Sequence, residues 1–176
     1  MRINLIPIQI RNNSLIDYIK KNLELVFNSE VLIDNIELDL KKYFNESRNQ
    51  YYSTEIIASS ISLSDKLNGK VLLLVDVDLF VPVFTYLFGE AQLDGKISIV
   101  STFRLYEEFY TGRTNDKLFY KRVLKEALHE LGHNFGLIHC ESWNCVMHAS
   151  AGIEEVDVKG ENFCGKCKSV ITGKMI

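Results

Sequence analysis

Three histidines and one glutamate in the last third of the chain have the spacing of a metal site. His129 and His133 are four residues apart and His139 follows Gly136, so the segment matches H-E-x-x-H-x-x-G-x-x-H at every fixed position. On a helix, positions i and i+4 present two imidazoles one turn apart, within reach of one Zn²⁺. Gly136 permits the chain reversal that would bring His139 to the same ion. Three neutral histidines leave one coordination position for water, and Glu130 would flank the metal without binding it.

The match is specific because all of its elements occur together. A single helical histidine is more often a core or surface residue than a ligand. This chain has only 4 His, 10 Gly and 14 Glu among 176 residues, and every His and Cys lies between His129 and Cys167. At these frequencies the five fixed positions would match by chance in roughly one chain in a hundred thousand. We therefore interpret His129, His133 and His139 as ligands of one zinc ion.

Four cysteines form a second cluster in the pattern C-x4-C-x18-C-x2-C: Cys140, Cys145, Cys164 and Cys167. The spacing is close to that of structural zinc sites, in which four thiolates complete the tetrahedron and leave no position for substrate. Two disulfides, a redox pair and a cysteine nucleophile are the alternatives. A reducing compartment and a tight Cys-Gly-Lys-Cys turn favour zinc. We therefore expect two zinc ions per chain, and because Cys140 follows His139, the second should fix the loop that carries the third histidine.

A long helix must carry the first two histidines. Possible N-cap residues at Thr114–Asp116 precede a helical pattern that runs from Lys117 to Gly136. The apolar residues of this pattern share one face, opposite His129 and His133, and we expect that face to pack on a sheet. They are Tyr120, Leu124, Ala127, Leu128, Leu131 and Phe135.

Upstream of this helix, strand and helix patterns alternate. Strands are expected over residues 3–10, 31–40, 71–75, 84–88 and 97–100, and helices from residue 14 and over 51–61. The continuous aliphatic run Val71–Val75 suits a strand buried on both faces. This order predicts an α/β fold, a compact three-layer domain with a mixed, mostly parallel sheet. We expect one domain over 1–176, with an upper α/β part at 1–136 and a lower part at 137–176 held by the cysteine site.

Charge and hydropathy argue against several partners. The chain has 20 Lys and Arg against 23 Asp and Glu, a net charge of −3, whereas a nucleic-acid binder is usually basic. The longest aliphatic run, Val71–Val75, is far shorter than the roughly 18 to 20 residues that span a bilayer. Pro7 and Gln9 interrupt the first apolar run, which is more typical of a strand than of a secretory leader. We expect a cytoplasmic monomer with no nucleic-acid or membrane partner.

Taken together, these residues resemble the archaemetzincin family of zinc metallopeptidases. The resemblance rests on His129–Cys140, Cys145-Val146-Met147 and Cys164-Gly165-Lys166-Cys167, and upstream on Arg48, Gln50-Tyr51, Asp76–Phe80, Phe88–Ala91 and Ser101–Leu105. It implies a metzincin-like fold, a catalytic zinc on the three histidines, a separate zinc on the four cysteines and a methionine turn at Met147 beneath the metal. Other metzincins often have a tyrosine two residues after this methionine, where this chain has Ala149.

The resulting hypothesis is hydrolysis of a peptide bond in a peptide or protein substrate. Zinc would lower the pKa of a bound water and polarise the carbonyl, while Glu130 would act as general base. The substrate would lie extended along an edge strand, expected within Phe84–Gln92. The alternative is a non-catalytic or regulatory zinc-binding module with a vestigial peptidase site. His148 is expected to be a surface residue without a metal role.

Overall fold

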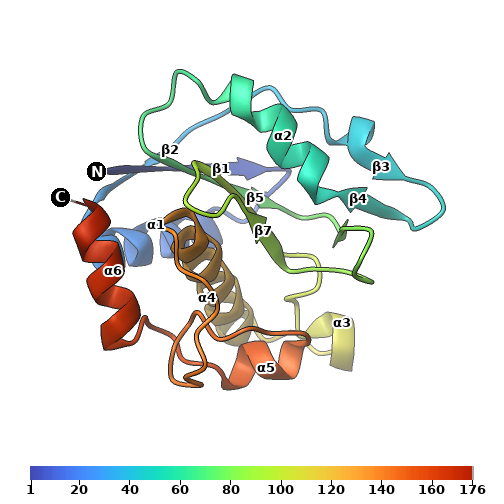
Figure 1. Cartoon of the computed structure of the whole chain (residues 1–176). Helices are drawn as coiled ribbons and strands as arrows, with labels where there is room; N and C mark the ends of the chain where they lie inside the picture. Colours follow the sequence, from blue (N-terminus) through green and yellow to red (C-terminus); the bar gives the residue numbers. More distant parts are fainter. Residues whose placement is uncertain (176) are drawn as a thin grey trace.

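A five-stranded sheet forms the centre of the fold in the computed structural model, which describes residues 1–175 (Figure 1). The strands, in spatial order, are β2 (Glu30–Ile33), β1 (Arg2–Ile8), β5 (Lys70–Val75), β8 (Ile97–Ser101) and β7 (Gly89–Ala91). The first four are parallel, and β7 is antiparallel to β8 at the edge. This arrangement confirms the predicted α/β class with a mixed, mostly parallel sheet.

Strand β5 shows why the sheet must be covered on both sides. Val71, Leu73 and Val75 belong to one buried cluster, whereas Leu72 and Leu74 belong to another, because successive side chains of a strand point to opposite faces. Helix α2 (Ser53–Leu63) contributes to the first cluster. Helices α1 (Asn13–Phe27) and α4 (Asp116–Asn134) contribute to the second and lie together beneath the sheet (Figure 1). The three-layer prediction is confirmed.

Helix α4 is held at both ends. The Asn115 side chain accepts a hydrogen bond from the backbone N–H of Leu118 at 3.1 Å, which makes Asn115 the N-cap among the three candidates. At the other end, Lys70 Nζ donates to the carbonyl of Asn134 at 2.7 Å. Gly136 follows with φ +83°, in the left-handed region that favours glycine, so the chain reverses where the sequence predicts.

Two predicted strands are wrong in part or in whole. Residues 31–40 form only the short β2, after which the chain is irregular and enters a 3₁₀ helix, η1 (Leu40–Tyr43). Residues 84–88 form a loop, and the edge strand is β7, immediately after it. The reason is that side chains bind the backbone of this loop: Arg48 Nη2 donates to the carbonyls of Phe84 and Thr85 at 2.7 and 3.1 Å, and Gln50 Nε2 donates to that of Thr85 at 3.0 Å.

A small second sheet was not predicted. It consists of β3 (Phe44–Asn45), β4 (Gln50–Tyr52) and β6 (Leu79–Phe80). Strand β4 takes the first two residues of the segment predicted as a helix over 51–61, and α2 begins at Ser53 instead.

The remainder of the described chain forms the lower part of the molecule in Figure 1. Its helices are α3 (Glu108–Thr111), which precedes α4, and α5 (Ile153–Val158) and α6 (Gly165–Met175), which follow it. The irregular segment between α4 and α5 carries His139 and the first two cysteines. Among residues 1–175, no helix combines the length and the hydropathy needed to cross a bilayer.

Candidate metal centres

The three predicted histidines converge at the C-terminal end of α4. His129 and His133 project from the helix, and His139 returns from the segment after Gly136. One ring nitrogen of each lies within 4.8 Å of the others, and Nε2 of His129 and His133 are 3.1 Å apart. Three nitrogen donors therefore face a common point, as the sequence predicts.

Backbone carbonyls determine which nitrogen of the first two histidines is available. His129 Nδ1 lies 2.9 Å from the carbonyl of Val146, and His133 Nδ1 lies 2.7 Å from that of Leu137. Because a carbonyl only accepts hydrogen bonds, each Nδ1 must carry the proton, which leaves the Nε2 lone pair free for a metal.

Burial keeps the three imidazoles neutral. His129 is buried, His133 is half-buried and His139 is exposed at the mouth of the site. Burial lowers the pKa of His129 well below its ordinary value of 6.5, and it also lowers the pKa of His133 and of His139. The charge of Lys159 acts in the same direction on all three. At pH 7 the triad is therefore in the form that binds a metal.

Glu130 is buried beside the triad and lies against the edge strand. A Cβ at Gly89 would be 2.6 Å from Glu130 Cγ and 2.7 Å from its Oε1, so the missing side chain at position 89 makes room for this carboxyl group. Burial raises the pKa of Glu130 well above 4.5, and the nearby charge of Glu126 adds to the rise while Lys159 opposes it. A carboxyl group with a raised pKa can accept and return a proton near neutral pH.

A buried ion pair lies beside the triad and could not be predicted from the sequence. Lys159 is fully buried, and its Nζ lies 2.8 Å from Glu126 Oε1 and 3.5 Å from His129 Nδ1. Lys125 is also buried and donates to the carbonyl of Lys159 at 2.8 Å, which holds the end of α5 against α4. The only signal in the sequence was that Glu126 shares a helix face with His129. Nothing in the sequence indicates that Lys159, thirty-three residues after Glu126, is its partner.

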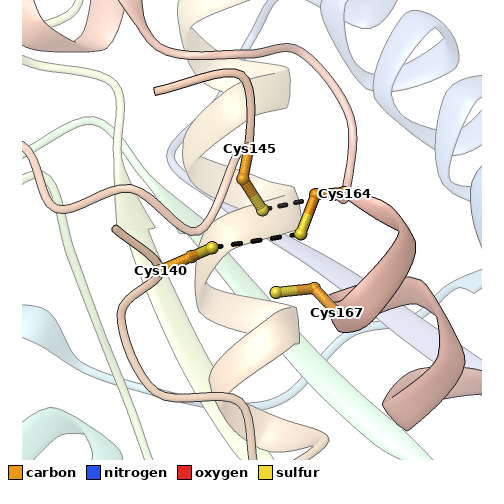
Figure 2. A group of neighbouring side chains, drawn as sticks. All are labelled: Cys140, Cys145, Cys164 and Cys167. Carbon is orange, nitrogen blue, oxygen red and sulfur yellow. Dashed lines mark hydrogen bonds between the residues drawn. The ribbon is translucent and has the colours of Figure 1, made fainter. Parts of the chain in front are cut away.

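The four cysteines gather as a second cluster, shown in Figure 2. The four Sγ atoms all lie within 4.8 Å of one another, and those of Cys140 and Cys164 are 3.9 Å apart. This separation is too long for a disulfide bond, and all four are free thiols. The backbone N–H of Cys164 donates to Cys145 Sγ at 3.3 Å. Hydrogen bonding, first to the backbone of Cys167, lowers the pKa of Cys164 to about 7.

The second pair of cysteines lies at a helix start and does not form an isolated turn. Helix α6 begins at Gly165, so Cys164 immediately precedes the helix and Cys167 lies in its first turn. This differs from the predicted knuckle and has the position that a redox pair would have at a helix N-terminus. The pair does not stand alone, however, because Cys140 and Cys145 approach the same point.

Short backbone contacts join the two clusters. The N–H of Cys140 donates to the carbonyl of Met147 at 2.9 Å, next to Val146, whose carbonyl orients His129. Met147 is fully buried beneath the helix, and a Cβ at Gly132 would lie 2.3 Å from its sulfur. The segment after Cys145 thus packs against α4 through Met147, the residue at which the sequence predicts a methionine turn.

His148, which the sequence predicts to be a surface residue without a metal role, is partly buried in the structure. Its Nδ1 lies 3.0 Å from the carbonyl of Cys140, and its ring lies 3.8 Å from that of Trp143. It therefore packs against the cysteine loop and is not among the residues that line the cleft at the histidine triad.

The triad opens into a cleft of about 790 Å³. Its upper wall comes from residues 84–91, which include β7, and its opposite wall from residues 149–151. Glu126, Glu130 and Lys159 also line it, so that the donor nitrogens, the buried carboxyl group and the ion pair share one cavity.

Comparison with known proteins agrees with this site. A family model described as "Peptidase family M54" matches residues 11–172. Archaemetzincin from Methanocaldococcus jannaschii is 38% identical over 167 residues, which cover 95% of this chain and 90% of that protein. The crystal structure of archaemetzincin from Methanopyrus kandleri is similar with a TM-score of 0.84 at 29% identity, covering 99% of this chain and 95% of that one. A zinc-dependent peptidase from Methanocorpusculum labreanum also gives a TM-score of 0.84 at 29% identity, covering 96% and 99%.

The fold, the histidine triad and these matches define the class of protein as a zinc metallopeptidase. Within that class, the chain belongs to the archaemetzincin family, peptidase family M54. The family implies a peptide substrate.

Proposed function

We propose that this protein hydrolyses peptide bonds at the histidine triad, with Glu130 as general base. The observation that carries the proposal is the common cleft in which the donor nitrogens of His129, His133 and His139 converge beside the buried Glu130 carboxyl group. A nitrogen site with a free coordination position and an adjacent carboxylate is the arrangement that metal-assisted hydrolysis needs.

Both donor sets suit zinc. Neutral imidazoles with fixed tautomers match the preference of Zn²⁺ for nitrogen ligands, and three of them leave one position open. The four thiols supply a complete tetrahedral set, as in structural zinc sites. We therefore propose two zinc ions per chain, a catalytic one on the histidines and a structural one on Cys140, Cys145, Cys164 and Cys167.

The positions of these groups assign each of them a role in the reaction. Zinc, when bound, supplies Lewis acidity that lowers the pKa of water and polarises the scissile carbonyl. Glu130 takes a proton from the attacking water and returns it to the leaving amine, for which its raised pKa is suited. Gly89 leaves the space that this carboxyl group occupies, and Met147 supports the helix from below.

The substrate binds along β7. This strand pairs with β8 on one side only, so its other edge can pair with an added strand. The edge available for pairing is Gly89–Ala91, which lies within the predicted span of residues 84–92 but is much shorter. An extended peptide on this edge would bring a carbonyl next to Glu130, because Gly89 is the residue that the Glu130 side chain contacts.

Digestion of a mixed peptide library, analysed by mass spectrometry, tests the proposal. The wild-type protein should generate new peptide ends, and Glu130→Ala should generate none while it keeps its fold and both zinc ions. Equal cleavage by the two proteins would contradict the role of Glu130. One zinc ion per chain, lost only when cysteines are replaced, would instead indicate a non-catalytic zinc-binding module.

A further inference from the structure

The two ends of the catalytic cleft differ. Near the C-terminal end of β7, Leu93 and Ile138 both line the cleft and are 59% and 72% exposed. His133 marks this end on the helix, because its carbonyl accepts a hydrogen bond from the backbone N–H of Asp94 at 2.9 Å. Because these apolar side chains stay exposed, we take this end as the open end of the cleft.

At the other end, a side chain crosses the cleft. Tyr86 precedes β7 in the upper wall, and its hydroxyl group donates to the carbonyl of Ala151 in the opposite wall at 3.4 Å. Both residues line the same cavity as the histidines. Glu126, one helical turn before Glu130 on α4, marks this end of the helix. The two walls therefore meet on the side of the triad opposite to Leu93.

The tyrosine ring is fixed in this position. The guanidinium group of Arg104 lies 4.2 Å from the ring centroid of Tyr86, and the Phe88 ring packs edge-on at 5.5 Å. Arg104 is itself held by two hydrogen bonds to Asp78, at 2.6 and 2.7 Å. The hydrogen bond to Ala151 is long, so these contacts, more than the hydroxyl group, keep the ring across the cleft.

The distance along the strand limits what can fit on this side. Tyr86 lies three residues before Gly89, which contacts Glu130. At about 3.3 Å per residue, the backbone of Tyr86 is at most about 10 Å from that of Gly89. A peptide paired with β7 therefore has room for at most about three residues between the scissile bond and Tyr86.

Strand direction decides which side of the substrate is limited. Antiparallel pairing is slightly more stable per residue than parallel pairing, and β7 already pairs antiparallel with β8. A peptide antiparallel to β7 has its N-terminal part at Leu93 and its C-terminal part at Tyr86. The restriction on substrate length is steric and does not depend on recognition of a terminal carboxylate. Lys159, the cation at this end of the cleft, is already paired with Glu126 at 2.8 Å.

We propose that Tyr86 and Ala151 close the C-terminal side of the cleft, so that the substrates are peptides with at most about three residues after the scissile bond. The inference rests on the proposed peptidase function and specifies its substrate class. Tyr86 is then a residue that determines specificity for chain length.

A nested set of peptides tests this assignment. One sequence that the wild-type protein cleaves is synthesised with two or with eight residues after the scissile bond, each as a free acid and as an amide, and a second set is extended on the N-terminal side. The longer C-terminal extension should lower kcat/KM about tenfold or more, N-terminal extension should not, and amidation should have little effect. Tyr86→Ala should raise the ratio of kcat/KM for the long over the short peptide about tenfold, whereas Tyr86→Phe, which keeps the ring, should leave that ratio low.

The outcomes separate this inference from the proposed function. Equal cleavage of long and short peptides by the wild-type protein overturns the length limit but leaves the peptidase function intact. A limit on the N-terminal side overturns the assigned direction. If no peptide of any length is cleaved, the peptidase function and the length limit both fail. If Tyr86→Ala does not fold, the wild-type series still decides, because it needs no variant.

Discussion

Replacing Gly89 with alanine should displace the proposed general base without touching a metal ligand. The added Cβ would lie 2.6 Å from Glu130 Cγ, 2.7 Å from Glu130 Oε1 and 2.8 Å from the backbone carbonyl of Ile99. Ordinary contacts of a Cβ begin at about 3.4 Å, so Glu130 or β7 must move by about 1 Å. The Ile99 carbonyl belongs to the neighbouring strand β8 and cannot yield without disturbing the sheet.

A displacement of about 1 Å in a catalytic group costs about a hundredfold in rate. We therefore expect Gly89→Ala to lower kcat about a hundredfold, with zinc content unchanged at two ions per chain. Steady-state hydrolysis of a cleaved library peptide measures kcat, and elemental analysis measures the metal. Gly173→Ala in α6 is a matched control, because a Cβ at Gly173 would meet no atom of another segment within 4 Å.

Stability provides an independent measurement of the same contact. Glu130→Ala removes Cγ and Oε1, so the destabilisation caused by Gly89→Ala should be smaller in that background than in the wild type. Urea unfolding of the two single variants and the double variant gives the interaction free energy. Additive stabilities together with a kcat within twofold of wild type would refute the proposed packing of Glu130 against Gly89.

Two further predictions concern buried charge. Lys159→Met leaves Glu126 as an unpaired buried carboxylate and should lower the free energy of unfolding by about 3 to 5 kcal/mol, whereas adding Glu126→Gln should recover much of the loss. A Lys159→Met protein as stable as wild type in urea would show that the pair is not needed. The second prediction concerns metal-free Glu130→Gln protein, in which the raised pKa of Glu130 can no longer offset the effect of His129 on stability. Burial keeps the pKa of His129 low in the folded state, so below pH 6.5 the unfolded state binds more protons than the folded state. The free energy of unfolding should then fall as the pH drops below about 6.5, and a constant urea midpoint from pH 7 to pH 5 would contradict this.

The metal-binding histidines and cysteines could be predicted from the sequence because short-range backbone geometry determines their relative positions. Helical spacing places His129 and His133 on one face, and a left-handed residue at Gly136 returns His139 to them. Cysteine spacing likewise predicted the second cluster. Each inference needs only backbone geometry over a few residues.

Contacts between distant segments could not be predicted in this way. The loop at 84–88 has strand-like residues, yet Arg48 and Gln50, more than thirty positions earlier, bind its carbonyl groups. Similarly, Lys159 is an ordinary lysine in the sequence, and only the folded chain places it beside Glu126 and His129. Propensity describes local preference, and tertiary contacts overrule it at these positions.

The central claim is that the histidine triad holds the zinc at which peptides are hydrolysed. Titration of metal-free protein with zinc, followed by hydrolysis of a library peptide and by bound metal, tests it most directly. Wild-type protein should bind two zinc ions and gain activity as the triad fills, and Glu130→Ala should bind both without gaining activity. Full activity with only the cysteine cluster occupied, or two bound ions without hydrolysis in the wild type, would contradict the claim.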